Sequence, residues 1–124
     1  MSERTLHRAV CDYLRYRYKD VIFNSDLSGA TKLTMGQAVA MKALRSNRGF
    51  PDLSIYEPRG SYHGLFIELK MEGTKLYNKL GLPATPHIGE QFDCLVELRQ
   101  RGYKAEFACG YNEAKDILDD YLNL

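Results

Sequence analysis

The sequence predicts an α/β domain in which a small mixed sheet is flanked by helices. Segments whose apolar residues recur every three or four positions alternate with shorter apolar runs, in the order helix, strand, helix, two strands, helix, strand, helix. At 124 residues the chain is long enough for one hydrophobic core and too short for two ordinary ones. We therefore expect residues 1–124 to form a single domain.

The N-terminal part is predicted to hold two helices. In the first, Leu6, Val10 and Leu14 fall on one face, and Ser2 is suited to cap the N-terminus. The second is indicated by a run rich in Ala, Met and Leu, residues that favour helices. The elements expected before residue 50 are a helix over 2–18, a short strand over 21–23, a loop over 24–32 and a helix over 35–45.

A hairpin is predicted in the middle of the chain, because the segments DLSIYE and LFIELK flank the turn-forming PRGSYHG. Side chains alternate along a strand, so Glu68 and Lys70 share one side of the sheet. We take Glu57 to pair with Leu65. This antiparallel register sets Asp52 opposite Lys70 and diagonal to Glu68. Two diagonal carboxylates can reach one small cation between them, which makes the hairpin the expected centre of chemistry.

The C-terminal part is predicted to contain two helices around one strand. Thr85 and Pro86 suit the cap and the first position of a helix, and Asn112 is expected to cap the last helix. Residues 71–86 mix Gly, Pro and Lys without periodicity, which predicts a long, mobile loop of the kind that often serves function. The elements expected here are a helix from Thr85 to Gly102, a strand over 104–109 and a helix after Asn112.

The composition excludes several classes of protein. With 44% hydrophobic and 27% charged residues, the chain falls among globular proteins rather than disordered or fibrous ones. It has no apolar run of membrane-spanning length and no signal-peptide pattern, so we expect no membrane association and a cytoplasmic location. The cysteines, Cys11, Cys94 and Cys109, are odd in number and far apart, so we expect reduced, mostly buried thiols rather than disulfides or a zinc site.

The charge is unevenly distributed along the chain. The net charge is only +1, but residues 1–51 carry nine Lys or Arg against four Asp or Glu, a local +5, and residues 87–124 carry four against eight, a local −4. A phosphate-facing surface could draw on the basic half. The alternative is that these charges merely solvate helix faces.

Asp52 and Glu68 provide the donors for a hard cation. Mg²⁺ prefers oxygen ligands and retains waters that substrate phosphates displace, whereas zinc would require His or Cys. Lys70 is placed to position an attacking water or to offset negative charge in a transition state. The alternative for Glu68 and Lys70 is a structural ion pair on an exposed sheet face. The histidines do not cluster at ligand spacing and are expected at the surface or in loops: His7, His63 and His87.

The hairpin resembles the signature of a known superfamily. Pro51-Asp52, fifteen residues and then Glu68-Leu69-Lys70 are similar to the pattern of the PD-(D/E)XK nucleases. The flanking segments RGFPDLSIY, GLFIELK and HIGEQFDCLVELRQRGYKAEFA resemble the VRR-NUC branch, in particular its small standalone forms, and the resemblance extends from Ser2 to Leu122. It implies a restriction-endonuclease-like fold, a mixed β-sheet flanked by helices.

The resemblance also implies a catalytic set. Asp52 and Glu68 would be the metal ligands together with the carbonyl of Leu69, and Lys70 would be the catalytic lysine. Gln91 would complete the set. The family tends to have an acidic residue near the start of its first helix, and Glu3 is the candidate here. The implied cofactor is Mg²⁺, with Mn²⁺ as a substitute.

The implied substrate is branched DNA in a bacterial or phage-infected cell. Resolution of a four-way (Holliday) junction requires two symmetric cuts, so a chain with one active site would act as a homodimer. A nuclease for flaps, nicks or duplex DNA and a non-catalytic DNA-binding module are the alternatives. The residues expected to contact DNA are Arg45, Arg48, Lys75 and Lys79.

Overall fold

The computed structural model describes residues 1–29 and 31–124 of the chain. Its elements follow the predicted order. They are α1 (Glu3–Arg17), β1 (Phe23–Ser25), the 3₁₀ turn η1 (Ser28–Ala30), α2 (Met35–Ala43), β2 (Leu53–Ile55), β3 (Leu65–Lys70), α3 (Pro86–Gln100), β4 (Lys104–Cys109) and α4 (Tyr111–Leu122). Within the described residues, no helix is long and apolar enough to span a membrane.

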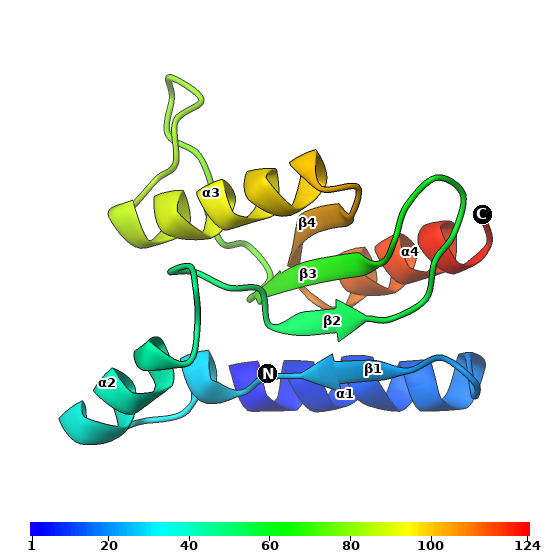
Figure 1. The fold of residues 1–124 in the computed structure, drawn as a ribbon, viewed down its shortest axis with the longest axis horizontal. Coiled ribbons are helices and arrows are strands. Elements are labelled where there is room, and N and C mark those ends of the chain that lie inside the picture. The colour runs from blue at the N-terminus through cyan, green and yellow to red at the C-terminus, as the bar shows by residue number, and fades with distance from the viewer.

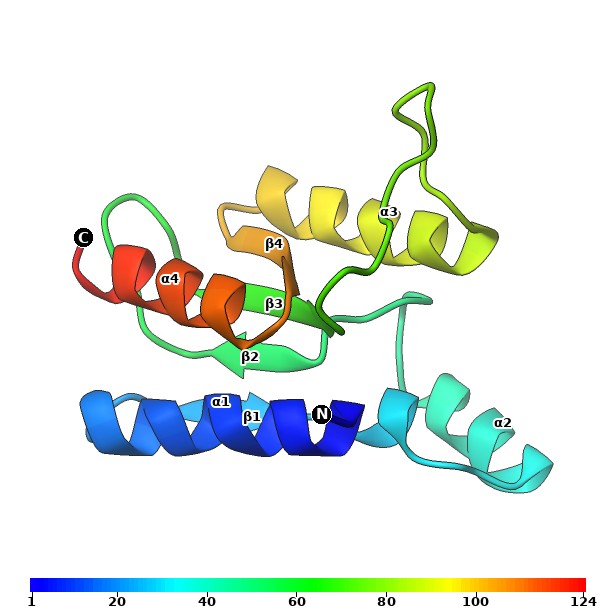
Figure 2. The ribbon, with the colours of Figure 1, turned by 180° about the vertical axis from the view of Figure 1, so that it is seen from behind.

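The four strands form one mixed sheet in the order β1-β2-β3-β4. Strands β1, β2 and β3 are antiparallel neighbours, and β4 lies parallel to β3. A parallel pair needs a crossover connection, which α3 provides. Helix α3 lies on one side of the strands and α1 on the other, while α2 projects from one end of the molecule (Figures 1 and 2). The predicted α/β class, with helices on both faces of the sheet, is therefore confirmed.

The main core lies between the sheet and helices α1 and α4. On β3, Leu65, Ile67 and Leu69 face this core and are at most 4% exposed. Side chains alternate along a strand, so the intervening residues face the opposite side, toward α3. The apolar residues that complete the core come from both helices and the neighbouring strands: Leu6, Val10, Leu14, Leu53, Ile55, Ala108, Ala114, Leu118, Tyr121 and Leu122.

Local capping sets the start of most helices. The side chains of Ser2 and Thr85 accept hydrogen bonds from backbone amides in the first turns of α1 and α3, as predicted, and Pro86 begins α3. The prediction that Asn112 caps the last helix is wrong. Gly110 occupies the N-cap of α4 with φ 93°, a conformation that glycine adopts readily, and Asn112 lies inside the first turn.

Two further boundaries differ from the sequence prediction. The first strand runs from Phe23 to Ser25 rather than over 21–23, because the chain stays paired with β2 beyond the apolar run while Ile22 remains 68% exposed. Helix α2 ends at Ala43, two residues early. The loop over 71–86 is folded back on itself by a bridge between Tyr77 and Pro83. All three cysteines are free, as expected.

Candidate active site

The register of the hairpin brings the two candidate ligands together. Leu53 pairs with Ile67 and Ile55 with Leu65, so the assumed pairing of Glu57 with Leu65 is wrong by two residues. Extending the observed register by one position places Asp52 directly opposite Glu68, not opposite Lys70. A shift of two residues preserves the face of every side chain. The carboxylates therefore still meet on the α3 side, and more closely than the diagonal arrangement would allow.

Asp52 is held from several directions. Its Oδ2 accepts a hydrogen bond of 3.0 Å from the backbone amide of Leu69 on β3. Its own carbonyl accepts one of 2.7 Å from the amide of Asp26, just after β1. Its side chain is 14% exposed. These contacts fix Asp52 just before the start of β2, with Oδ2 directed at β3.

Glu68 is a buried carboxylate beside another carboxylate. It is 4% exposed. Burial, followed by the hydrogen-bonding contact with Asp52 and the charge of Asp52, raises the pKa of Glu68 far above its usual range, and the ammonium of Lys70 opposes this. Two acidic groups in such a position repel one another when both are ionised. A cation between them would remove that repulsion.

Lys70 and Glu3 are both close enough to act on Glu68 electrostatically. Lys70 follows two positions later on β3 and is half-buried, so it shares the face of Glu68 as the alternation predicts. Glu3 lies in the first turn of α1 and is exposed, and its negative charge also raises the pKa of Glu68. The charges of Lys70 and Glu3 therefore both act on Glu68, in opposite directions.

Gln91 enters the site from α3. It is 5% exposed, and its Oε1 is a buried oxygen with no hydrogen-bond partner among the described residues. Its Nε2 lies 3.3 Å from Nε2 of His87, one turn earlier on the helix. A buried amide oxygen without a partner is costly, by about 1 to 3 kcal/mol. A ligand at this position would supply the missing partner.

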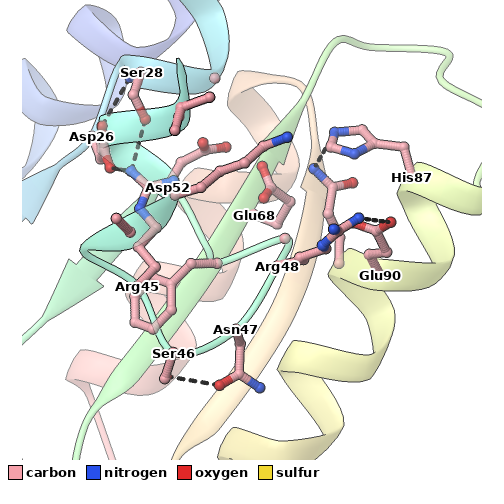
Figure 3. Close-up of a pocket in the computed structure, with 17 residues that line it drawn as sticks. Asp26, Ser28, Arg45, Ser46, Asn47, Arg48, Asp52, Glu68, His87 and Glu90 are labelled. Atoms are coloured by element: carbon pink, nitrogen blue, oxygen red, sulfur yellow. Dashed lines mark hydrogen bonds and ion pairs between the residues drawn. The ribbon is translucent and has the colours of Figure 1, made fainter. Parts of the chain in front are cut away.

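Asp52, Glu68, His87 and Gln91 line a cavity of about 780 Å³, whereas Lys70 and Glu3 are not among its lining residues. Asp52 and Glu68 lie at its centre, and the loop before β2 forms the opposite wall (Figure 3). On that wall Arg45 pairs with Asp26 and donates a hydrogen bond of 2.7 Å to Ser28. Arg48 lies 3.8 Å from a carboxylate oxygen of Glu90 on α3, with 75% of its side chain exposed. The remaining residues predicted to contact DNA, Lys75 and Lys79, are exposed on the loop between β3 and α3, outside this cavity.

The sequence predicts that His7 and His87 lie at the surface or in loops; the structure buries His7 beside Asp52 and leaves His87 exposed on α3. His7 is 4% exposed, its Nδ1 lies 3.0 Å from the hydroxyl of Ser25, and its Nε2 lies 3.9 Å from Oδ2 of Asp52. The surface prediction for His7 is therefore wrong. The available signal was its position one residue after Leu6 on the buried stripe of α1. His87 is exposed, as expected, and lines the cavity. His63 is exposed in the hairpin turn, also as expected.

The donor set suits a hard divalent cation. In an extended strand, the N–H and C=O of one residue point to the same side. Because the amide of Leu69 points at Asp52, its carbonyl points to the same edge, beyond the end of β2. The available oxygens are thus two carboxylates, this carbonyl and the partnerless Oε1 of Gln91. In the part of the chain that the structure describes, no cluster of three or more His, Cys, Asp or Glu that could hold a metal ion is found, so a cation here would need the backbone and amide oxygens beside the two carboxylates.

Comparison with known proteins identifies the fold. A solved structure described as a VRR_NUC domain protein matches with a TM-score of 0.72 and 24% identity, covering 100% of this chain and 90% of that one. A second, described as a VRR_NUC domain, matches with a TM-score of 0.49 and 21% identity, over 93% of this chain and 96% of that one. No protein-family model and no curated protein matches the chain. The chain therefore has the fold of the VRR_NUC domain protein, the fold that the sequence resemblance implied.

Proposed function

We propose that the protein is a metal-dependent DNA endonuclease that hydrolyses phosphodiesters. The observation that carries this proposal is the buried pair Asp52 and Glu68, directly opposed on neighbouring strands and open to a cavity with arginines on its other wall. Like charges are brought together in a protein interior at a considerable free-energy cost. A bound cation would offset the repulsion between the two carboxylates and could also bind a phosphate of the substrate. The fold shared with a VRR_NUC domain protein supports the proposal of a nuclease.

Mg²⁺ is the proposed cofactor, with Mn²⁺ as a substitute, and four oxygen donors would hold it: Asp52, Glu68, the Leu69 carbonyl and Gln91 Oε1. When bound, such an ion polarises a phosphodiester and lowers the pKa of a coordinated water. The other oxygen of Asp52 is already engaged by the Leu69 amide, so its orientation is preset. Burial excludes bulk water from Glu68 and strengthens each electrostatic contact there.

Lys70 is the proposed catalytic lysine. Its ammonium lies on the same face as Glu68, where it can orient the attacking water and offset negative charge developing on the phosphate. Glu3 is proposed to assist from α1 by contributing a further carboxylate near the ion. On the opposite wall, Arg45 and Arg48 would contact the DNA backbone, and Lys75 and Lys79 would do so from the loop between β3 and α3.

The proposed substrate is branched DNA, with a four-way junction as the first choice. One chain offers one such site, whereas symmetric resolution requires two cuts, so the acting unit is proposed to be a twofold homodimer. Sedimentation analysis of the protein tests this point. A purely monomeric protein that still cuts flaps, nicks or duplex would exclude junction resolution and leave a simpler nuclease.

A cleavage assay tests the chemistry. The protein is incubated with labelled four-way junction, flap and linear duplex in Mg²⁺, Mn²⁺ or EDTA, beside Glu68→Ala and Lys70→Ala. The chain offers a matched control in Lys104 and Glu106, an amine and a carboxylate two residues apart on β4, joined at 3.3 Å and facing away from α3.

Metal-dependent cutting by the wild type and by Glu106→Ala is expected, with a loss of at least 100-fold in the two site variants. Inactivity of the wild type on all three DNAs would refute the enzyme proposal. Full activity in Lys70→Ala would remove that residue from the catalytic set. Equal cutting of junction and linear duplex would keep the nuclease and discard the resolvase.

A further inference from the structure

A second cavity, of about 650 Å³, lies between α1 and the outer side of β1. It is lined on the helix by Arg4, Arg8 and Arg15, and on the strand by Phe23 and Asn24. None of these residues belongs to the proposed catalytic set. We refer to this cavity as the α1–β1 groove. Its arginines belong to the basic segment 1–51, which has a local charge of +5. Other basic residues of this segment, Arg45 and Arg48, line the candidate active site.

The α1–β1 groove retains positive charge after its internal ion pairs are counted. Arg8 donates to Asp12 at 3.0 Å, and Arg15 donates to the same carboxylate at 3.2 Å, so one acid is shared between two guanidinium groups. Arg15 also lies over the ring of Phe23, at 5.4 Å from the ring centroid. No ion pair of Arg4 is found among the described residues. Three arginines and one aspartate leave the groove with two positive charges.

The groove and the candidate active site lie on opposite sides of one short segment of chain. Ser25 and Leu27 line the groove, whereas Asp26 and Ser28 line the catalytic cavity. The buried His7 joins the two, because it lines the groove while its Nε2 lies 3.9 Å from Asp52. A ligand in the groove would therefore sit one layer of chain away from the proposed metal ligands.

We propose that the α1–β1 groove binds the phosphodiester backbone of DNA next to the cleaved bond, with Arg4 and Arg8 as the phosphate contacts. This inference rests on the proposed function, since it names where that substrate is held outside the catalytic cavity. Guanidinium groups bind phosphate oxygens in a bidentate manner, and the amide of Asn24 adds a neutral donor on the facing strand. Arg15 stacks over the ring of Phe23 and so connects the helix side of the groove to the strand side.

Salt-dependent binding measures the number of phosphate contacts directly. Fluorescence anisotropy of a labelled duplex is recorded in EDTA, where no cleavage occurs, over a range of salt concentrations. The double variant Arg4→Gln/Arg8→Gln is compared with the wild type, with Arg4→Lys/Arg8→Lys as the conservative variant. Arg101→Gln is the matched control, because Arg101 forms the same kind of exposed i,i+4 pair, with Glu97, at the far end of α3.

Each lost phosphate contact lowers the slope of log affinity against log salt by about 0.9 and the affinity by roughly tenfold at about 0.1 M salt. The Gln double variant is therefore expected to lose about 1.8 from the slope. The Lys variant and Arg101→Gln are expected to keep the wild-type slope.

The outcomes separate this inference from the proposed function. An unchanged slope in the Gln double variant of a protein that binds and cuts DNA would overturn the groove and leave the nuclease intact. The expected loss of slope in a protein that never cuts DNA would support the groove and refute the nuclease. An equal loss of slope in Arg101→Gln would overturn the groove, because the effect would then be one of overall charge.

Discussion

Replacing Gly49 by alanine tests whether the loop before β2 is locked against α3. Gly49 has φ 69°, and a Cβ placed there would lie 2.6 Å from the backbone nitrogen of Gln91 and 2.7 Å from its Cα. A left-handed conformation costs a residue with a Cβ about 1 to 2 kcal/mol. Insertion of a methyl group against fixed backbone costs a further 1 to 3 kcal/mol or so. We expect Gly49→Ala to lower the free energy of unfolding by about 2 to 5 kcal/mol.

The clash also has a functional consequence. Relief requires either the loop that carries Arg45 and Arg48 to move away from α3, or the turn of α3 that carries Gln91 to shift. Both movements widen the cavity and displace groups proposed to hold the ion or the DNA. Single-turnover cleavage should therefore fall in Gly49→Ala under conditions where the variant remains folded, and a misplacement of about 1 Å is enough for a loss on the order of 100-fold.

Urea unfolding followed by circular dichroism measures the stability change, and Gly73→Ala is the control. Gly73 has φ 83° with no other atom within 4 Å of an added Cβ, so it carries the backbone cost without the clash. We expect a loss of about 1 to 2 kcal/mol there and unchanged cleavage. Equal stability losses in Gly49→Ala and Gly73→Ala would refute the close packing of the loop on α3.

Two further predictions follow from the charged groups. Glu68→Gln removes one of two opposed carboxylates, so it should raise the free energy of unfolding by on the order of 2 kcal/mol in EDTA at neutral pH. The gain should disappear in Mg²⁺, as measured by urea unfolding in both buffers. Burial opposes ionisation of Asp119, but hydrogen bonds from Tyr13 (2.5 Å) and Tyr18 (2.6 Å) outweigh it, with help from Lys115, and the pKa of Asp119 is lowered. The native carboxyl then binds its proton later than the unfolded one does, so its stabilising effect is present above the unfolded value near 4 and is lost as the pH falls through the lowered pKa. Asp119→Asn should thus cost about 1 kcal/mol at neutral pH and reduce the loss of stability below pH 4, and parallel acid unfolding curves for the two proteins would contradict this.

The sequence was sufficient for the order of elements and for the face on which Glu68 and Lys70 lie. Both follow from local periodicity, which needs no knowledge of distant contacts. The exact register of the hairpin did not follow, because it depends on how many residues the connection takes up: nine, residues 56–64, rather than the seven of PRGSYHG. The assumed register differs from the observed one by two residues, however, and a shift by an even number leaves the side chain of Asp52 on the same face of the sheet. The sequence therefore predicts that Asp52, Glu68 and Lys70 share one face of the sheet, but not which of them lie directly opposite one another.

Other parts of the site required tertiary contacts that no single segment encodes. His7 lies on the buried stripe of α1, but its proximity to Ser25 and Asp52 depends on how β1 packs across that helix. The apolar run predicts a strand over 21–23, whereas pairing with β2 defines the strand as Phe23–Ser25. The N-cap of α4 falls on Gly110 rather than Asn112 because the chain leaves β4 with a positive φ, which glycine adopts readily.

The two walls of the candidate active-site cavity differ in how many of their residues are buried. We use this difference to assign the proposed chemistry to one wall and the choice of substrate to the other. On one wall Glu68 and Gln91 are nearly inaccessible and are fixed by β3 and α3. On the other, α2 contains no buried residue in the described chain, and its apolar side chains Met35 and Val39 are 85% and 63% exposed. Segments with few buried contacts open at lower free energy than the core. The proposed chemistry thus rests on the rigid wall, while α2 can adjust, so we expect selection among branched, flapped and linear DNA to depend chiefly on α2.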